Sequence, residues 1–387
     1  VLVPEARPFV AGPQTAEAAL RALAARHRRP LLRVNRAGAA DDLVFEGESL
    51  AIEADGRLAA RLPAFETAEA LLHFGVRSGF RPATVAPRGS DEERLWQALL
   101  VGLRDYVAKN RFPGVVLGLS GGIDSAVVAA LAVDALGADR VWCVLLPSCF
   151  TSAASVEDAA AVAHALGVRF DTIAIGPGVD AVESMLVPPF AGRPRDLAEE
   201  NLQARMRMLL LMALSNKFGH LLLSTGNKSE VAVGYGTLYG DMAGGFNPLK
   251  DIYKSMVFRL ARWRNGHRPA GGRGPAGEVI PEAVIEKPPS AELRADQRDD
   301  DSLPPYEVLD PILHALIEER LAVGDVVARG LSDAATAARV EQLLFAAEHK
   351  RRQSCPGPSV SGASFARDWR YPVTNPFRSA GLSGDAG

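Results

Sequence analysis

Residues 115–125 read Val-Val-Leu-Gly-Leu-Ser-Gly-Gly-Ile-Asp-Ser, and this stretch decides the fold class. An apolar run leads into a glycine pair and then a helical pattern, which predicts a strand, a tight turn and a helix. Backbone N–H groups at the start of such a helix attract anions, and Gly121 and Gly122 let the backbone approach a ligand closely. Asp124 would repel phosphates unless a cation lay between them, so we expect Mg²⁺ there.

The turn matches neither GxxxxGK[ST] nor GxGxxG. A simple capped helix after a tight turn would not explain two glycines, two serines and an aspartate together. The stretch therefore predicts a phosphate-binding turn.

Strand and helix patterns alternate on both sides of this turn, and the strands are continuous apolar runs. This predicts an α/β fold with a Rossmann-like parallel sheet and helices on both faces. The expected strands are 115–119, 141–146, 169–175 and 220–224, and the expected helices are 91–109, 125–136, 155–166, 197–216, 306–320 and 334–352. Residues 265–288 are rich in Gly and Pro, and we expect a flexible loop there.

The first 85 residues show a different organisation. The pattern predicts a helix at 15–28, strands at 31–34, 43–45 and 50–52, and a hairpin turn at Asp55-Gly56. A complete α/β layer needs more strands, so this segment is interpreted as the C-terminal part of a larger domain. The expected division is 1–85, 90–378 and a tail at 379–387.

Composition excludes several classes of partner. The net charge of -3 gives no basic field for nucleic acid. The apolar runs are shorter than the ~18 residues of a membrane span, and the first residues lack the pattern of a secretory signal. The cysteines Cys143, Cys149 and Cys355 form no CxxC pair and no zinc-ligand spacing, so we expect free thiols and a cytoplasmic location.

Three further stretches carry polar residues at the expected ligand edge of the sheet. In 200–207, Asn201 and Arg205 are four residues apart and share a helix face, which suits a ligand with hydroxyls and phosphates. Residues 224–251 begin at the end of a strand, where open α/β sheets bind ligands, and interleave glycines with charged residues. The third stretch, 287–294, reads Lys-Pro-Pro-Ser-Ala-Glu-Leu-Arg.

The turn resembles the pyrophosphate-binding loop of the ATP-pyrophosphatase superfamily, which includes NAD, GMP and asparagine synthetases. With the three further stretches, residues 90–378 closely resemble the synthetase domain of glutamine-dependent NAD synthetase. This resemblance implies ATP-dependent amidation of deamido-NAD to NAD by ammonia through an adenylated intermediate, with release of AMP and pyrophosphate. It also implies a homodimer or larger homo-oligomer.

The resemblance also implies residue roles. Asp124 and Lys254 are the implied catalytic residues, and Asp124 and Glu230 are the implied Mg²⁺ ligands. The implied ATP contacts are Gly118, Leu119, Ser120, Gly121, Gly122, Ile123, Asp124, Ser125, Thr225, Lys254 and Ser290. The implied deamido-NAD contacts are Asn201, Arg205, Glu230, Asp241, His349 and Lys350. Leu238 departs from the pattern, because the ammonia-dependent relatives carry a lysine there.

Residues 1–80 resemble the C-terminal end of a nitrilase-type glutaminase domain, on the stretches 7–9, 34–36 and 42–47. That domain uses a Glu, a Lys and a nucleophilic Cys, but the first lysine here is Lys109 and the first cysteine is Cys143. Arg7 and Pro13 also replace the Ser and Lys of the family pattern. Two explanations stay open, a fragment of a longer synthetase and a natural remnant that uses free ammonia. We expect ammonia as the direct nitrogen donor, and glutamine only with an intact upstream domain.

Two alternative functions also stay open. One is another ATP-pyrophosphatase-type ligase, acting on a nucleotide or an RNA, although the low basicity argues against RNA. The other is a non-catalytic nucleotide-sensing module, which would not need both Asp124 and Glu230.

Overall fold

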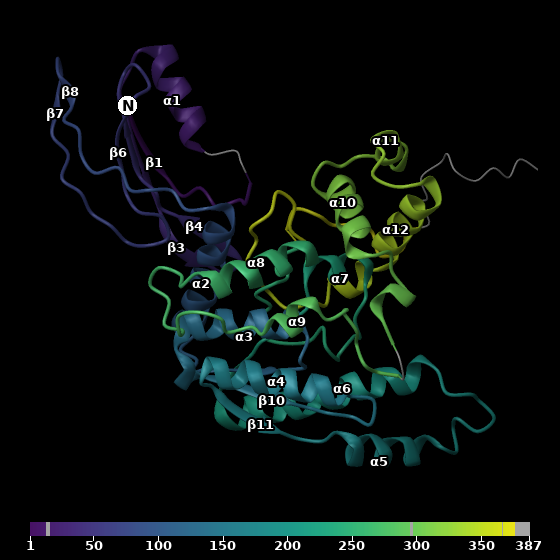
Figure 1. Ribbon diagram of the computed structural model, residues 1–387. Helices are drawn as coiled ribbons and strands as arrows, with labels where there is room; N and C mark the ends of the chain where they lie inside the picture. The colour runs from purple at the N-terminus through teal and green to yellow at the C-terminus, as the bar shows by residue number, and fades with distance from the viewer. Residues whose placement is uncertain (13–15, 295–296, 366, 376–387) are drawn as a thin grey trace, which may run out of the picture. The chain divides into compact units, whose positions relative to one another are not determined.

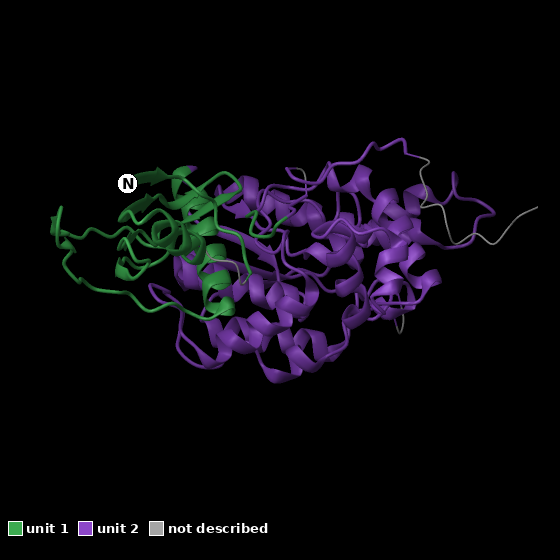
Figure 2. Ribbon diagram, turned by 90° about the horizontal axis from the view of Figure 1, so that it is seen from above, with its two compact units in different colours: residues 1–109, 358–362 green, residues 110–357, 363–387 purple. Residues whose placement is uncertain are grey.

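The computed structural model describes residues 1–12, 16–294, 297–365 and 367–375. The chain divides into two compact units, residues 1–109 with 358–362 and residues 110–357 with 363–387 (Figure 2). The division falls later than the expected one, because the helix Asp91–Lys109 belongs to the first unit. The tail expected at 379–387 and the departure at Pro13 lie outside the described residues.

A four-stranded mixed sheet forms the centre of the first unit, with the strand order β1-β2-β5-β6. The strands are β1 (Leu2–Glu5), β2 (Leu31–Asn35), β5 (Leu50–Ile52) and β6 (Leu58–Arg61). In this sheet β1 and β2 pair in parallel, whereas β2 with β5 and β5 with β6 pair antiparallel. The helix α1 (Ala16–His27) packs through Ala24 against Leu31 and Ile52. The predicted Asp55-Gly56 turn joins β5 to β6, and Gly56 has a φ of +86°, which glycine adopts readily.

The same unit contains two short hairpins and the helix α2 (Asp91–Lys109). The hairpins are β3 (Ala37–Ala40) with β4 (Leu43–Glu46) and β7 (Phe74–Gly75) with β8 (Gly79–Phe80). Asp105 of α2 accepts a hydrogen bond of 2.8 Å from the backbone N–H of Ala39. Arg94 of α2 lies 2.5 Å from a carboxylate oxygen of Glu46 and 3.2 Å from one of Glu48. These contacts explain why α2 belongs to this unit.

A parallel sheet forms the centre of the second unit, as the sequence predicted. Its order is β11-β10-β9-β12, and each neighbouring pair is parallel. The strands are β9 (Val115–Gly118), β10 (Val141–Leu145), β11 (Arg169–Thr172) and β12 (Leu221–Leu222). β12 is shorter than the expected strand 220–224. Leu223 follows it, donates its backbone N–H to Val116 of β9 at 2.9 Å and also bridges to Phe246. The carboxyl ends of the parallel strands therefore meet at one edge.

Helices cover both faces of this sheet (Figure 1). The helices are α3 (Ile123–Leu136), α4 (Ala153–Leu166), α5 (Gly176–Leu186) and α6 (Leu197–Phe218). On one face, Val116, Trp142 and Leu222 of the strands pack with Met208 and Leu211 of α6. The opposite face is covered by α3, which is buried over almost its whole length. The Rossmann-like arrangement is thus confirmed.

Further helices follow the last strand, and Figure 1 shows α10, α11 and α12 grouped together. They are α7 (Lys228–Val233), α8 (Lys254–Gly266), α9 (Glu282–Glu286), α10 (Tyr306–Ile317), α11 (Val323–Ala328), α12 (Ala334–Ala346) and α13 (Glu348–Arg351). Within the described part of the chain there are also two one-turn 3₁₀ helices, Ala138–Arg140 and Asp299–Asp301. The single helix expected at 334–352 is interrupted at Ala347. Among the described residues, no helix is both long and apolar enough to cross a bilayer.

The segment expected to be a flexible loop, 265–288, is tied to the body of the second unit. It contains α9, and residues 267–281 lack regular structure. Arg264 forms a fully buried ion pair with Asp134, with N–O distances of 2.6 and 3.0 Å. The Arg264 guanidinium also donates to the carbonyl oxygens of Pro275 and Gly277. The Gly- and Pro-rich composition predicted the missing secondary structure, but these long-range bonds are invisible in the sequence.

Candidate active site

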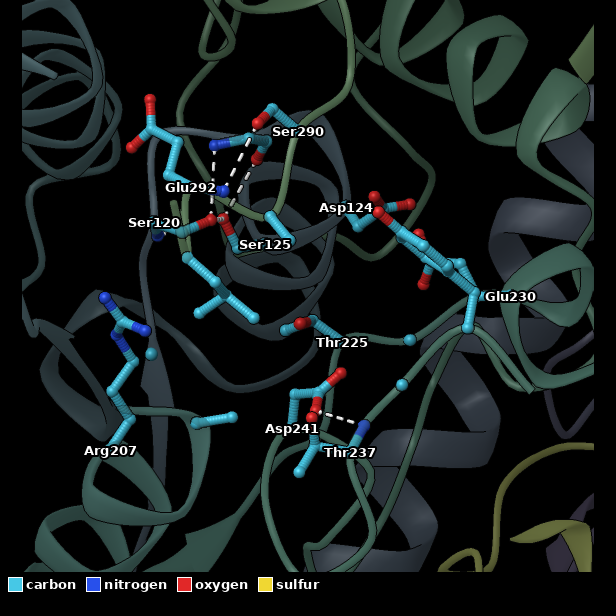
Figure 3. A pocket seen from close by; sticks show the side chains of 18 of the residues that line it. Ser120, Asp124, Ser125, Arg207, Thr225, Glu230, Thr237, Asp241, Ser290 and Glu292 are labelled. Carbon is cyan, nitrogen blue, oxygen red and sulfur yellow. Dashed lines mark hydrogen bonds between the residues drawn. The ribbon is translucent and has the colours of Figure 1, made fainter. Parts of the chain in front are cut away.

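A cavity of about 800 Å³ lies in the second unit at the carboxyl edge of the parallel sheet. The ends of β9, β10 and β12 contribute Gly118, Leu146 and Leu223 to its wall. Figure 3 shows side chains of the turn after β9 facing those of residues 225–241 across this space. Open α/β sheets bind their ligands at this position, so the cavity is the candidate active site.

The glycine turn forms one wall of the cavity. Gly121 has a φ of +81°, and a Cβ there would lie 2.3 Å from the carbonyl oxygen of Ser155, so no other residue fits. Gly122 is the N-cap residue of α3, and no side chain caps that end of the helix. The hydroxyls of Ser120 and Ser125 lie 3.2 Å apart beside it. An uncapped helix start with two hydroxyl donors is suited to an anion.

Three charged side chains from three helices meet beside this turn. The ammonium of Lys254 forms an ion pair with Asp124 and lies 3.5 Å from a carboxylate oxygen of Glu230. Asn227 links the two acids, because its side-chain amide donates to Asp124 at 3.0 Å and its backbone N–H donates to Glu230 at 3.2 Å. The sequence predicted all three charged residues, and the structure brings them together.

Burial dominates the electrostatics of this cluster. Burial and the neighbouring Asp124 carboxylate raise the pKa of Glu230 to about 8. Burial opposes the charge on Lys254, but Asp124 and Glu230 outweigh it and raise the pKa of that ammonium. The two acids therefore compete for one lysine, and the cluster can accommodate further positive charge.

The donor set fits a Mg²⁺ ion that is shared with a ligand. Asp124 and Glu230 offer carboxylate oxygens, which Mg²⁺ prefers. Among the described residues, no group of three or more His, Cys, Asp or Glu could hold a metal by itself. Two carboxylates next to a turn that is suited to an anion fit the usual arrangement, in which Mg²⁺ takes its other ligands from phosphates and water.

A polar group lines the opposite wall. Thr237 donates its hydroxyl to Asn201 at 2.7 Å, and its backbone N–H donates to Asp241 at 2.8 Å. Lys350 reaches the same wall and donates to the carbonyl oxygens of Gly234 and Gly236, each at 2.7 Å. Asn201, Asp241 and Lys350, which the sequence analysis predicted as deamido-NAD contacts, all line the cavity.

Gly121, an expected ATP contact, does not line this cavity, and neither do two expected deamido-NAD contacts, Arg205 and His349. Both side chains are exposed. Arg205 donates to the carbonyl oxygen of Leu238 at 3.2 Å, and a ring nitrogen of His349 lies 2.9 Å from the carbonyl oxygen of Ala346.

Helix geometry explains the position of Arg205. The α6 residues that line the cavity are Leu197, Glu200, Asn201, Ala204, Arg207, Met208 and Leu211. At 100° per residue, Arg205 lies about 100° from the middle of this stripe, whereas Arg207 lies about 60° from it. The spacing of Asn201 and Arg205 alone could not show on which side of Asn201 the stripe extends.

A strap formed by residues 287–294 and 297–302 closes another side of the cavity. Lys287 and Glu292 both contact the start of α4, where the ammonium lies 2.6 Å and the carboxylate 2.7 Å from the hydroxyl of Ser155. The predicted Ser290 lines the cavity between them. The sequence analysis did not single out Lys287, Glu292 or Asp299 individually, although it quoted the stretch that carries the first two.

Comparison with known proteins identifies the family. The profile described as NAD synthase matches residues 95–354. The chain belongs to the NAD synthase family. It is 53% identical over 355 residues to the glutamine-dependent NAD(+) synthetase of Rhodobacter capsulatus, covering 90% of this chain and 64% of that relative. The corresponding Acinetobacter baylyi protein is 46% identical over 380 residues, covering 98% and 69%.

Solved structures of NAD synthetases are also similar to this chain. The glutamine-dependent NAD+ synthetase of Acinetobacter baumannii, in complex with ADP, is 43% identical with a TM-score of 0.71, covering 97% of this chain and 67% of that one. NMN synthetase from Francisella tularensis is 28% identical with a TM-score of 0.55, covering 68% and 97%. The resemblance predicted from the sequence is confirmed, as is the nitrilase-like plus synthetase fold. The chain spans about two thirds of the length of its glutamine-dependent relatives, 64% to 69% for the first two.

Proposed function

We propose that this chain catalyses the ATP-dependent amidation of deamido-NAD to NAD, with release of AMP and pyrophosphate. The observation that carries the proposal is the meeting of Asp124, Glu230 and Lys254 at the uncapped start of α3, in one cavity with Asn201 and Asp241. The membership of the NAD synthase family and the ADP bound to the Acinetobacter baumannii relative support an adenine nucleotide here.

In the first step, a carboxylate oxygen of the nicotinate group attacks the α-phosphorus of ATP, and pyrophosphate leaves. The α3 start, the hydroxyls of Ser120 and Ser125 and the ammonium of Lys254 stabilise the negative charge on the departing group. Thr225 and Ser290 line the same space, which supports them as further ATP contacts. Mg²⁺ held by Asp124 and Glu230 would neutralise phosphate charge.

In the second step, ammonia attacks the carbonyl carbon of the adenylate, AMP leaves with the former carboxylate oxygen, and the nitrogen releases one proton to water. No covalent enzyme intermediate is needed, because the chain contributes positioning and charge stabilisation. Asn201, Glu230, Asp241 and Lys350 are the proposed contacts to deamido-NAD, since each lines the cavity. Arg205 and His349 do not line it, and the proposal assigns them no contact.

We propose ammonia as the direct nitrogen donor of the chain described here, because residues 1–108 contain neither lysine nor cysteine. A nitrilase-type glutaminase needs both residue types, so glutamine would serve only with an intact upstream domain. We also propose a homo-oligomer, because apolar side chains of α5 and α6 such as Met185 and Leu209 are exposed on the second unit.

The test is to incubate the purified chain with ATP, Mg²⁺ and deamido-NAD, with either ammonium or glutamine, and to measure NAD and AMP. NAD from ammonium alone is the expected result. NAD from glutamine would contradict the proposed nitrogen donor. Turnover of the deamido-mononucleotide in place of the dinucleotide would indicate an NMN synthetase instead.

A control variant, Glu230→Gln, separates an enzyme from a nucleotide sensor. The enzyme should lose turnover, whereas a sensor should still bind ATP without dependence on Mg²⁺. A folded chain that binds ATP but makes no amide from either nitrogen source would contradict the proposed reaction.

A further inference from the structure

The cavity is lined by more acidic than basic side chains. Seven lining residues are acidic and five are basic, although both proposed substrates are polyanions. The acidic residues are Asp124, Asp196, Glu200, Glu230, Asp241, Glu292 and Asp299, and the basic ones are Arg207, Lys254, Lys287, Arg294 and Lys350. Few basic side chains in this cavity are therefore available to bind an anionic ligand.

Four of the five basic side chains are engaged by other groups of the chain at their charged ends. The partners are the carboxylates of Asp124 and Glu230 for Lys254, Ser155 and Asp158 for Lys287, Glu200 and Asp301 for Arg294, and the carbonyl oxygens of Gly234 and Gly236 for Lys350. Each of these side chains would have to give up contacts to bind a substrate anion.

Arg207 is held differently. Its Nε donates to the carbonyl oxygen of Leu146 at 2.9 Å, at the carboxyl end of β10. Within the described residues, neither terminal amino group of this guanidinium has a hydrogen bond or ion pair. The bond to Leu146 orients the guanidinium without using the two groups that form the fork for a carboxylate or phosphate.

The surroundings strengthen an interaction at this position. Arg207 is half-buried, and its α6 neighbours in the cavity wall include Ala204, Met208 and Leu211, all buried and apolar. Electrostatic attraction is stronger next to such a wall than in open water. Burial lowers the pKa of Arg207, and the carboxylates of Glu292 and Asp241 partly offset this, so the guanidinium lies within their reach.

We propose that Arg207 is a substrate-binding residue that donates its two terminal amino groups to a pair of anionic oxygens of deamido-NAD. The inference rests on the proposed function and adds a contact that the family resemblance did not supply. Arg207 projects from the same helix as Asn201, a proposed deamido-NAD contact, whereas the proposed ATP phosphate site is at the α3 start with Lys254. Figure 3 shows Arg207 on the wall away from Asp124 and Glu230.

The anionic oxygens can belong to the nicotinate carboxylate or to the pyrophosphate of the dinucleotide. NAD distinguishes these two sources, because it keeps the pyrophosphate and has a neutral amide in place of the carboxylate. Calorimetry with deamido-NAD, NAD and ATP on Arg207→Gln, Arg207→Lys and the unmodified chain therefore tests the proposal. Lys217→Gln, which removes one exposed charge from the same helix, is the matched control.

Arg207→Gln should weaken deamido-NAD binding about 10- to 100-fold, the usual range for loss of charged hydrogen bonds, and change ATP affinity less than threefold. The deamido-NAD affinity of Arg207→Lys should lie between those of Arg207→Gln and the unmodified chain, because lysine keeps the charge but lacks the forked pair of amino groups. Weakening of deamido-NAD alone identifies the carboxylate, and equal weakening of NAD identifies the phosphates. Lys217→Gln should leave all three affinities unchanged.

A folded Arg207→Gln chain with unchanged deamido-NAD affinity, or with loss of ATP affinity alone, overturns the proposal. Circular dichroism establishes folding, and if the Gln variant is unfolded, Arg207→Lys alone decides by the same criterion. Absence of deamido-NAD binding to the unmodified chain would overturn both the proposed function and this inference. Normal binding by both chains overturns this inference only.

Discussion

The carboxylate of Asp310 accepts a hydrogen bond of 2.5 Å from the hydroxyl of Ser229. Its second oxygen accepts the backbone N–H of Ser255 at 2.8 Å, and the Ser229 hydroxyl in turn accepts the backbone N–H of Lys254 at 2.9 Å. The N-cap residue of α8, Tyr253, provides no side-chain cap, so Asp310 and Ser229 satisfy these N–H groups instead. One buried aspartate thus fixes the helix starts that carry Glu230 and Lys254.

The first prediction follows from this network. Asp310→Ala should lower kcat about tenfold or more and destabilise the chain by about 1–3 kcal/mol, because buried donors lose their acceptor. Asp333→Ala is the matched control, since Asp333 caps α12 at 2.9 Å from the N–H of Thr336 and does not line the cavity. The control substitution should lower the free energy of unfolding by about 1 kcal/mol and leave kcat unchanged. Equal kcat for both variants, measured below their unfolding temperatures, would contradict a positioning role.

The second prediction concerns Gly121. Gly121→Ala should abolish ATP binding, because its φ of +81° and the 2.3 Å approach of a Cβ to the Ser155 carbonyl oxygen force the turn to move. Gly167→Ala is the control, since Gly167 has a φ of +67° but no atom within 4 Å of an added Cβ. It should cost about 1 kcal/mol in stability and leave ATP affinity unchanged. Calorimetric titration with ATP distinguishes the two, and wild-type affinity in Gly121→Ala would refute this account of the turn.

In the second unit, the sequence predicted best those strands that are buried along almost their whole length. β9 and β10 are buried on both faces, so each is a continuous apolar run with little ambiguity. β12 was expected to be longer, because Leu223 is as buried and apolar as the ladder residues, although the paired strand ends at Leu222. Burial is visible in a sequence, and strand pairing is not.

The helix α8, which the sequence analysis missed, buries charged side chains. Lys254 and Arg264 of α8 are almost completely buried, and each pairs with an acid 130 residues away, Asp124 and Asp134 respectively. A helix of this kind has no clear apolar stripe, so periodicity did not reveal it. In the site, the sequence revealed the glycine turn but not Arg207, because the spacing of residues on α6 does not show which face of the helix lines the cavity.

The third prediction concerns the buried pair of Asp134 and Arg264. Arg264→Met should destabilise the chain by about 3–5 kcal/mol, because it removes the guanidinium from a fully buried carboxylate. Arg262→Met is the control, since Arg262 lies 4.0 Å from Glu282 and both side chains are more than half exposed. It should cost less than about 1 kcal/mol. Urea unfolding followed by circular dichroism measures both, and equal midpoints would contradict the importance of the buried pair.

The fourth prediction concerns assembly. Leu209 on α6 is 62% exposed and Met185 on α5 is 74% exposed, and the two helices pack against each other in the second unit. If these helices form the contact in the proposed homo-oligomer, Leu209→Glu should shift the chain toward a monomer. Light scattering after size exclusion measures this, with the exposed Lys217→Gln as a control that should not change the mass. A monomeric unmodified chain at micromolar concentration would contradict the proposal.

The fifth prediction concerns the three free thiols. Burial raises the pKa of Cys143 to about 12 and that of Cys355 to about 11, so both remain protonated at pH 8 and shielded from reagents. Cys149 is exposed after β10, so the folded chain should react with one equivalent of Ellman's reagent rapidly and with three after denaturation. Cys149→Ser should remove the rapid phase and leave the two slow thiols. Rapid reaction of two or more thiols in the native chain would contradict the burial of Cys143 and Cys355.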